Sequence, residues 1–360
     1  MARDRESREL ERLRRRRRVR RQRMLAAAIM LMLGGIGVGV AIGLAGGGHR
    51  RRAAATTDAS TPTTTAVPPP RVLPSAYAVG LATLQLVDTS RSVKFLDGRT
   101  EPRTLTTTVR YPALGARSDV DEEGAAPDTT DGPYPLIVFG EGYDESPSFY
   151  RLLLQSWARA GYVVAAPAFP LESPEAPGGP LETDLVNQPA DMRFVIDQLL
   201  GESAGGSGPL AGLIDPHEIA VAGQSDGGDT ALALAYDPRF RDRRIGAAAI
   251  LSGAEIPYLS PFTFPAGGPP LLATQGTADT INPPGATYQY FAAAHRPKYL
   301  LRLPGAEHLP PYSSQQPQLG IVERSTTAFF DVYLKHRPAS LRALHAAAAV
   351  PGKATLQAEP

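Results

Sequence analysis

The chain has 360 residues, of which 42% are hydrophobic and 20% charged, with 35 glycines and 35 prolines. This composition excludes collagen, a coiled coil and a wholly disordered protein, and predicts a chain that buries a core. The absence of cysteine further excludes disulfides, thiolate zinc sites, iron–sulfur clusters and cysteine nucleophiles.

The net charge of +1 conceals a basic N-terminal tail, since residues 1–24 hold 12 arginines against four acidic residues. Residues 24–44 then contain no charge, and as a helix they would span the roughly 30 Å of a bilayer core. The tail is more basic than the Arg50–Arg52 flank, so the positive-inside rule predicts a cytoplasmic N-terminus. We therefore expect a cell-membrane protein with a cytoplasmic tail at 1–23, a transmembrane signal anchor at 24–45 and an extracytoplasmic remainder.

Alternatives for this segment are a signal peptide whose cleavage releases a secreted protein, and a buried core helix. The arginine run could bind nucleic acid, but the adjoining apolar segment argues against a nucleic-acid partner. Gly35, Gly39 and Gly43 share one helix face, a weak indication of a dimer between two such helices.

Residues 46–75 are rich in Thr, Ala and Pro and predict an extended linker. From residue 76 to about 345, apolar strand-like runs alternate with helical runs, and we expect a flexible C-terminal tail at 346–360. Such alternation predicts an α/β domain whose mostly parallel sheet carries helices on both faces, entered through an antiparallel strand pair. The predicted strands are 81–87, 104–113, 136–140, 163–169, 219–223, 247–253, 271–276 and 299–305, and the predicted helices are 147–160, 184–201, 227–236, 285–295 and 319–335.

Two serines fit the G-x-S-x-G pattern of a nucleophile on a tight strand-to-helix turn. Ser225 follows the strand-like run 219–222 and precedes a helical run, which is the context that the turn requires. Ser203 instead follows a helical run and leads into a glycine-rich loop, where Gly201 or Gly205 would end the helix in the left-handed conformation. We therefore predict Ser225 as the nucleophile.

A serine nucleophile needs a base, and the base needs an acid that fixes its tautomer. His308 lies in the loop directly after the predicted strand 299–305, at the edge of the sheet where the strands end. Asp279 follows the strand 271–276 and can face His308 there, with Glu255 as the alternative acid. Ser225, Asp279 and His308 thus follow one another along the chain in the order nucleophile, acid, base, which is typical of a nucleophile on such a strand-to-helix turn.

Acyl transfer also needs two N–H donors for the developing oxyanion. The backbone N–H of Asp226, directly after the nucleophile, is one candidate. The N–H of Tyr143, in the glycine-containing turn after 136–140, is the other.

These stretches resemble the α/β-hydrolase superfamily, and within it the bacterial esterase branch that includes dienelactone hydrolases, platelet-activating-factor acetylhydrolases and cutinase-like lipases. The resemblance covers residues 76–340 and implies the same triad and oxyanion donors. Two residues depart from the family, which usually has His at the positions of Glu141 and Gln224. If Glu141 and Asp226 are both ionised, they should disfavour anionic substrates. The matching stretches are TVRYPA (108–113), PLIVFGEGY (135–143), GYVVAAPAFP (161–170), GQSDGG (223–228), GTADTINP (276–283) and PGAEH (304–308).

Two insertions border the predicted site. One is the polar stretch 169–191, and the other is 256–268, whose Tyr258, Phe262 and Phe264 could form an apolar pocket wall with Glu141 nearby, or could simply pack the loop. Because no large lid is evident, we expect an open pocket for short-chain or surface-presented esters.

The sequence thus predicts a membrane-anchored, extracytoplasmic serine esterase acting through an acyl-enzyme on Ser225, with no cofactor and no metal. Its substrate would be a small-molecule, lipid or polymeric ester. An acyltransferase that uses the same triad, and a non-catalytic protein that binds an envelope component, remain as alternatives.

Overall fold

The computed structural model describes residues 77–256, 259 and 263–360. All of them belong to one unit of the chain, residues 70–360. The predicted tail, signal anchor and linker lie outside the described residues. Within the part of the chain that is described, every helix is too short or too polar to cross a bilayer.

A ten-stranded sheet forms the centre of this unit, in the order β10-β9-β8-β7-β6-β4-β5-β2-β1-β3. The strands β4 to β9 run parallel, whereas β1, β2 and β10 pair antiparallel with their neighbours. The predicted antiparallel entry into a mostly parallel sheet is confirmed. The strands are β1 (Ala78–Lys94), β2 (Thr100–Ala113), β3 (Glu122–Glu123), β4 (Tyr134–Gly140), β5 (Val163–Ala168), β6 (Ile214–Gln224), β7 (Ile245–Leu251), β8 (Leu271–Gly276), β9 (Lys298–Leu303) and β10 (Thr355–Glu359).

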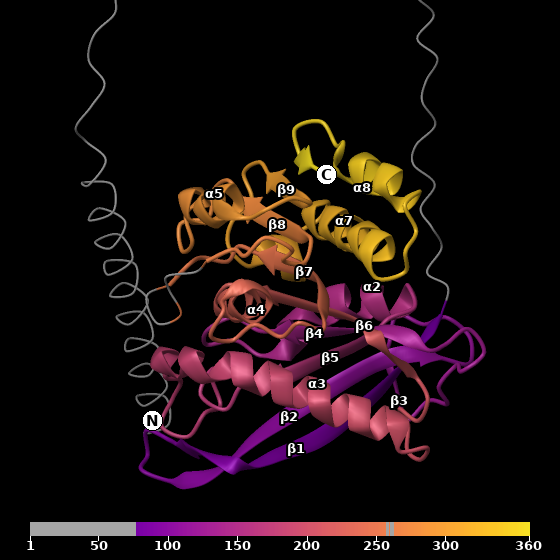
Figure 1. Cartoon of the computed structure of the whole chain (residues 1–360), viewed down its shortest axis with the longest axis vertical. Coiled ribbons are helices and arrows are strands. Elements are labelled where there is room, and N and C mark those ends of the chain that lie inside the picture. The colour runs from indigo at the N-terminus through magenta and orange to yellow at the C-terminus, as the bar shows by residue number, and fades with distance from the viewer. Residues whose placement is uncertain (1–76, 257–258, 260–262) are drawn as a thin grey trace, which may run out of the picture. The chain divides into compact units, whose positions relative to one another are not determined.

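Helices cover both faces of the sheet, and Figure 1 shows α3 lying across the strands on one of them. The 3-10 helices are η1 (Pro147–Tyr150) and η2 (Glu182–Asn187). The α-helices are α2 (Arg151–Arg159), α3 (Gln188–Ala204), α4 (Asp226–Tyr236), α5 (Pro284–Ala293), α6 (Pro310–Ser313), α7 (Gln318–Tyr333) and α8 (Ser340–Ala348).

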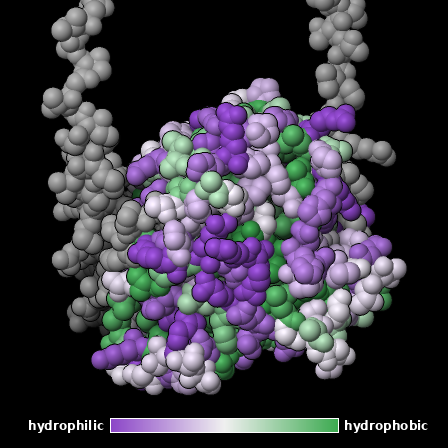
Figure 2. All heavy atoms as spheres, viewed as in Figure 1, coloured by the Kyte–Doolittle hydropathy of each residue, from purple (hydrophilic) through white to green (hydrophobic). Residues whose placement is uncertain are grey.

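The two faces pack separate hydrophobic cores because successive strand side chains point to opposite sides. Leu136 and Val138 of β4 join the core beneath α3, α4 and α5, whereas Ile137 and Phe139 join the core beneath α2, α7 and α8. This explains why the central strands are continuous apolar runs rather than alternating ones. The surface is different, since Figure 2 shows hydrophobic residues only in separate patches among hydrophilic ones on the face that it views.

The parallel strands end in register, which brings the loops after them to one edge of the sheet. Gly140 of β4 pairs with Gly223 of β6, and Gln224 of β6 pairs with Leu251 of β7. We call this side the catalytic edge, since the predicted site residues follow these strands.

The C-terminal residues 346–360, predicted as a flexible tail, are ordered instead. Helix α8 extends to Ala348, and β10 pairs antiparallel with β9, with Leu356 opposite Leu301. This pairing satisfies the backbone N–H and C=O groups on the outer side of β9, which would otherwise be the last strand of the sheet. The domain therefore continues to Glu359 rather than ending near residue 345.

Candidate active site

Ser225 occupies a turn with no intervening loop, because β6 ends at Gln224 and α4 begins at Asp226. Its backbone has φ 53° and ψ −123°, a conformation that costs a residue with a side chain about 1–3 kcal/mol. Two hydrogen bonds hold it there, from Ser225 N–H to the Leu251 carbonyl and from Asp229 N–H to the Ser225 carbonyl, each 3.0 Å long. This is the geometry of a nucleophile elbow.

Glycines flank the elbow because backbones approach closely there. A Cβ on Gly223 would lie 2.1 Å from the Gly227 carbonyl oxygen, and a Cβ on Gly227 would lie 2.1 Å from the Gly140 carbonyl oxygen. The second approach presses the first turn of α4 against the end of β4. The loop after β4 is therefore in contact with the elbow.

Ser203, the other serine in a G-x-S-x-G pattern, lies on α3 at the opposite edge of the sheet. Its hydroxyl accepts a 3.0 Å hydrogen bond from Ile214 N–H, at the beginning of β6. The left-handed glycine that follows the helix is Gly206 (φ 69°), not Gly201 or Gly205 as expected from the sequence. Gly205 still has a right-handed backbone (φ −69°), so the reversal comes one residue later.

His308 and Asp279 form a buried pair on the loops after β9 and β8. The distance between His308 Nδ1 and Asp279 Oδ2 is 2.7 Å, and the side chains are 8% and 0% exposed. Asp279 Oδ1 accepts 2.9 Å hydrogen bonds from the N–H groups of Ile281 and Asn282, which fix the carboxylate. With Nδ1 donating to Asp279, Nε2 of His308 is left as the basic nitrogen.

Two further hydrogen bonds connect these loops to residues at the ends of β6 and β7. Gln224, directly before the nucleophile, donates from Nε2 to the His308 carbonyl at 3.2 Å. Asn282 donates from Nδ2 to the carbonyl of Ser252, just after β7, at 2.7 Å. Ser225, Asp279 and His308 thus lie on cross-linked loops at one edge.

The predicted oxyanion donors lie at the two sides of the contact between β4 and α4. Asp226 is the first residue of α4, where the positive end of the helix dipole and backbone N–H groups favour an anion. Tyr143 lies three residues beyond β4, and its hydroxyl donates to the Pro180 carbonyl at 3.2 Å. The hydroxyl therefore holds the loop after β4 against the 169–191 insertion.

Glu141 is fully buried, with Oε1 accepting a 2.7 Å hydrogen bond from Phe169 N–H. Its other oxygen has no hydrogen-bond partner among the described residues. Burial raises the pKa of Glu141 well above its usual value, because desolvation disfavours the charged form. Glu141 thus links two loops, and its raised pKa favours the neutral acid over the ionised form considered in the sequence analysis.

Of the three aromatic residues predicted to line the pocket, only Phe264 belongs to the described part of the chain. Tyr258 and Phe262 lie outside the described residues. Phe264 is half-buried and packs on Tyr236 of α4, with ring centroids 5.1 Å apart. Phe264 therefore packs its loop against α4, which is the second of the two roles that the sequence left open for it.

A buried ion cluster, not anticipated from the sequence, fixes the 169–191 insertion. Arg103 of β2 binds Asp184 and Asp191, with Nη2 2.6 Å from an oxygen of each, and its side chain is 2% exposed. The insertion is also joined to the elbow helix, since Thr230 donates to Gln188 and Gln188 donates to Glu172. No local pattern signals this cluster, because Arg103 is more than 80 positions from either aspartate.

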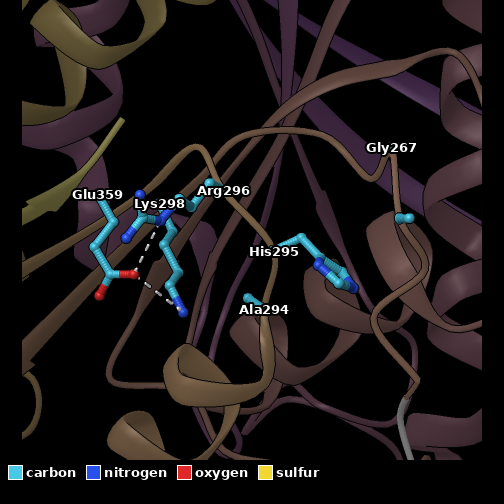
Figure 3. Close-up of a pocket in the computed structure, with 7 residues that line it drawn as sticks. Gly267, Ala294, His295, Arg296, Lys298 and Glu359 are labelled. Carbon is cyan, nitrogen blue, oxygen red and sulfur yellow. Dashed lines mark ion pairs between the residues drawn. The ribbon is translucent and has the colours of Figure 1, made fainter.

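A hollow of about 480 Å³ lies elsewhere, where β9 begins, and is thus remote from the catalytic edge. Figure 3 shows Glu359 reaching between Arg296 and Lys298, with both ion pairs at 3.6 Å. Lys298 also donates to the Phe291 carbonyl, at the end of α5. These contacts give the hollow a structural role in joining α5, β9 and β10. No group of His, Asp and Glu residues suited to a metal ion occurs in the described ranges.

Comparisons with known proteins agree with this geometry. The profile of the Chlorophyllase family matches residues 125–251, which include the loop after β4 and the elbow. Among solved structures, the chain is similar to a ferulic acid esterase from Streptomyces cinnamoneus, with 23% identity, a TM-score of 0.54, and coverage of 75% of this chain and 93% of that one. No curated protein gives a significant match.

The fold, with its elbow, is the α/β-hydrolase fold. The two matches relate the chain more particularly to its esterase-like members, as the sequence motifs predicted.

Proposed function

We propose that the protein is a serine esterase that cleaves carboxylic esters through an acyl-enzyme on Ser225. The observation that carries this proposal is the buried 2.7 Å hydrogen bond between His308 and Asp279. The loop of His308 is in turn hydrogen-bonded to Gln224, the residue that precedes the elbow serine. The printed name of the structural neighbour, an esterase, favours the same chemistry.

In the proposed mechanism, Ser225 Oγ attacks the ester carbonyl while His308 Nε2 takes its proton. Asp279 holds the imidazole and stabilises its charged form. The N–H groups of Asp226 and Tyr143 donate to the oxyanion, and the loss of one such donor typically slows a reaction of this kind about 10²–10³-fold. The protonated His308 then gives its proton to the leaving alcohol, and a water molecule, deprotonated by the same imidazole, releases the acid.

We further propose that the domain is held on the outer side of the cell membrane by residues 24–45. The charge-free segment 24–44 and its arginine-rich flank support this location. Fractionation of cells that express the full chain tests it. The proposal expects the domain in the membrane fraction and digested by protease added to intact cells, whereas recovery in the medium would indicate a secreted protein.

The activity is tested with p-nitrophenyl esters from acetate to palmitate. The full-length protein should hydrolyse the short esters, Ser225→Ala should abolish turnover, and Ser203→Ala should retain it. Ser203→Ala is a matched control, because Ser203 is also buried but lies at the opposite edge. Equal turnover by the wild type and Ser225→Ala would refute the proposal.

A further inference from the structure

A pair of buried polar side chains, Tyr150 and Gln224, lies between the loop after β4 and the loop that carries His308. Both residues are 0% exposed. The Tyr150 hydroxyl donates to Gln224 Oε1 at 2.8 Å, and Gln224 Nε2 donates to the His308 carbonyl at 3.2 Å. On the other side, Gly142 N–H donates to the Tyr150 hydroxyl at 3.3 Å. A continuous chain of hydrogen bonds thus connects Gly142 to His308.

The position of this chain relates it to the proposed chemistry. Gly142 directly precedes Tyr143, the proposed oxyanion donor, and Gln224 directly precedes Ser225. One end of the chain, Gly142, is therefore one residue from the proposed oxyanion donor. The other end is the backbone carbonyl of the base His308, reached through Gln224, which is one residue from the nucleophile. A shift of Tyr150 or Gln224 would be transmitted to the base, the nucleophile and the oxyanion donor together.

The packing leaves little freedom for the pair. The ring of Tyr150 packs on Phe139 of β4, with centroids 4.8 Å apart, and its hydroxyl also lies within hydrogen-bond distance of Glu145 Oε2, a second acceptor for the same proton. A Cβ on Gly142 would lie 2.7 Å from Gln224 Oε1, so the backbone of the loop rests directly on the amide. Because Nε2 must face the His308 carbonyl, the amide has one orientation that satisfies both of its neighbours.

We propose that Tyr150 and Gln224 are positioning residues that hold the oxyanion loop and the base at a fixed distance around Ser225. This inference rests on the proposed esterase function. Neither side chain is required to touch the substrate. Their effect should appear in the transition state, where the oxyanion and the charged imidazole exist, and hardly in substrate binding.

The test compares kcat and KM for p-nitrophenyl acetate in the full-length protein. Tyr150→Phe keeps the ring and removes the hydroxyl, and it should lower kcat about 10–100-fold with little change in KM, since misplacement by about 1 Å costs up to about 10²-fold. Gln224→Met interrupts the same chain and should lower kcat at least as much. If the two residues act through one chain, the double variant should be no slower than Gln224→Met alone.

A matched control separates positioning from general loss of stability. Tyr162 is also 0% exposed and packs in the same core as Tyr150, but it directly precedes β5, at the end of the sheet opposite the catalytic edge, and its hydroxyl donates to Asp331 at 2.7 Å. Tyr162→Phe should lower the melting temperature about as much as Tyr150→Phe while leaving kcat unchanged. An equal fall of kcat in both variants would show a stability effect and overturn the proposal.

The outcomes distinguish this inference from the function on which it rests. An inactive wild-type protein would remove the esterase proposal and the positioning role with it. An active wild type whose Tyr150→Phe and Gln224→Met variants retain full kcat, or whose losses are simply additive, would remove the positioning role alone. If Tyr150→Phe fails to fold, Gln224→Met tests the same chain from its other end.

Discussion

The imidazole of His308 and the carboxylate of Asp279 form a 2.7 Å hydrogen bond, although 29 residues separate them in the chain. The parallel pairing of β8 with β9 makes this contact, since Gly276 lies opposite Leu303 and both strands end there. A Cβ on Gly276 would lie 2.4 Å from the Ala306 carbonyl oxygen, so the two loops touch where they leave the sheet. The sheet register thus positions the acid against the base.

Removing the charge of Asp279 should uncouple this pair. Asp279→Asn is expected to lower kcat about 10³–10⁴-fold, because an amide stabilises the wrong tautomer of the imidazole and cannot balance its charge. Steady-state kinetics with p-nitrophenyl acetate measures the loss. Asp331→Asn is the control, because Asp331 is also buried and accepts a hydrogen bond from a tyrosine, yet lies far from the catalytic edge. A similar kcat for the wild type and Asp279→Asn would mean that another acid serves His308.

Glu141 should make the folded protein less stable as pH rises. Its folded pKa is raised by burial above the ordinary value of 4.5, so above pH 4.5 the folded state holds a proton that the unfolded state has lost. The free energy of unfolding then falls with pH, by at most about 1.4 kcal/mol per pH unit, until the folded pKa is reached.

Urea unfolding between pH 4.5 and 8 tests this linkage. Glu141→Gln has the same shape and cannot ionise, so its stability should lack this pH-dependent fall. The difference between variant and wild type should grow in favour of the variant as pH increases. Parallel curves for the two proteins would show that Glu141 ionises normally.

Breaking the ion cluster at Arg103 should destabilise the domain strongly. Arg103→Met leaves Asp184 buried without its cation and Asp191 with Arg91 alone, and loss of one partner of such a pair costs about 3–5 kcal/mol. Arg99→Met is the control, because Arg99 is exposed and its pairs with Asp97 and Glu101 are screened by water. Urea unfolding should show a large loss for the first variant and almost none for the second. Equal losses would contradict a special role for the cluster.

The charge at the catalytic edge predicts a preference among substrates. The loops after β4, β5, β7, β8 and β9 contain ten acidic residues and no lysine or arginine. Burial raises the pKa of Glu141 and Asp184 is paired with Arg103, but Glu175 and Glu307 are exposed. Esters with an anionic group should therefore have a kcat/KM about tenfold below that of neutral esters of the same length, and added salt should narrow the gap. The loops are 141–146, 169–187, 252–270, 277–283 and 304–317.

Glu307→Gln identifies the source of this preference. The variant should accept anionic esters better than the wild type does, whereas Glu202→Gln, an exposed residue on α3 at the opposite edge, should not. Comparable rates for anionic and neutral esters at low salt would show that the edge does not select by charge.

Local patterns in the sequence were sufficient for the parallel strands and for the elbow. The strand at 271–276 has the predicted bounds, and Ser225 could be separated from Ser203 because only Ser225 lies between a strand and a helix. Parallel strands buried on both faces are continuous apolar runs, and such runs are recognisable without knowledge of their neighbours.

Features that depend on distant pairing could not be predicted in this way. The segment 355–359 is short and mixed in polarity, and only its pairing with β9 makes it a strand. The same holds for the contact of Gln224 with the His308 carbonyl, which joins residues 84 positions apart. The burial that raises the pKa of Glu141 arises only in the folded domain, where its side chain lies against Phe169 of a separate loop.

Whether Ser225 is an activated nucleophile is tested directly by labelling the full-length protein with a fluorophosphonate probe and mapping the modified residue by mass spectrometry. An activated Ser225 should give a single adduct on Ser225, faster labelling of the wild type than of Asp279→Asn, and none in Ser225→Ala. A folded protein that gives no adduct, or an adduct on Ser203, would contradict the assignment of Ser225 as an activated nucleophile.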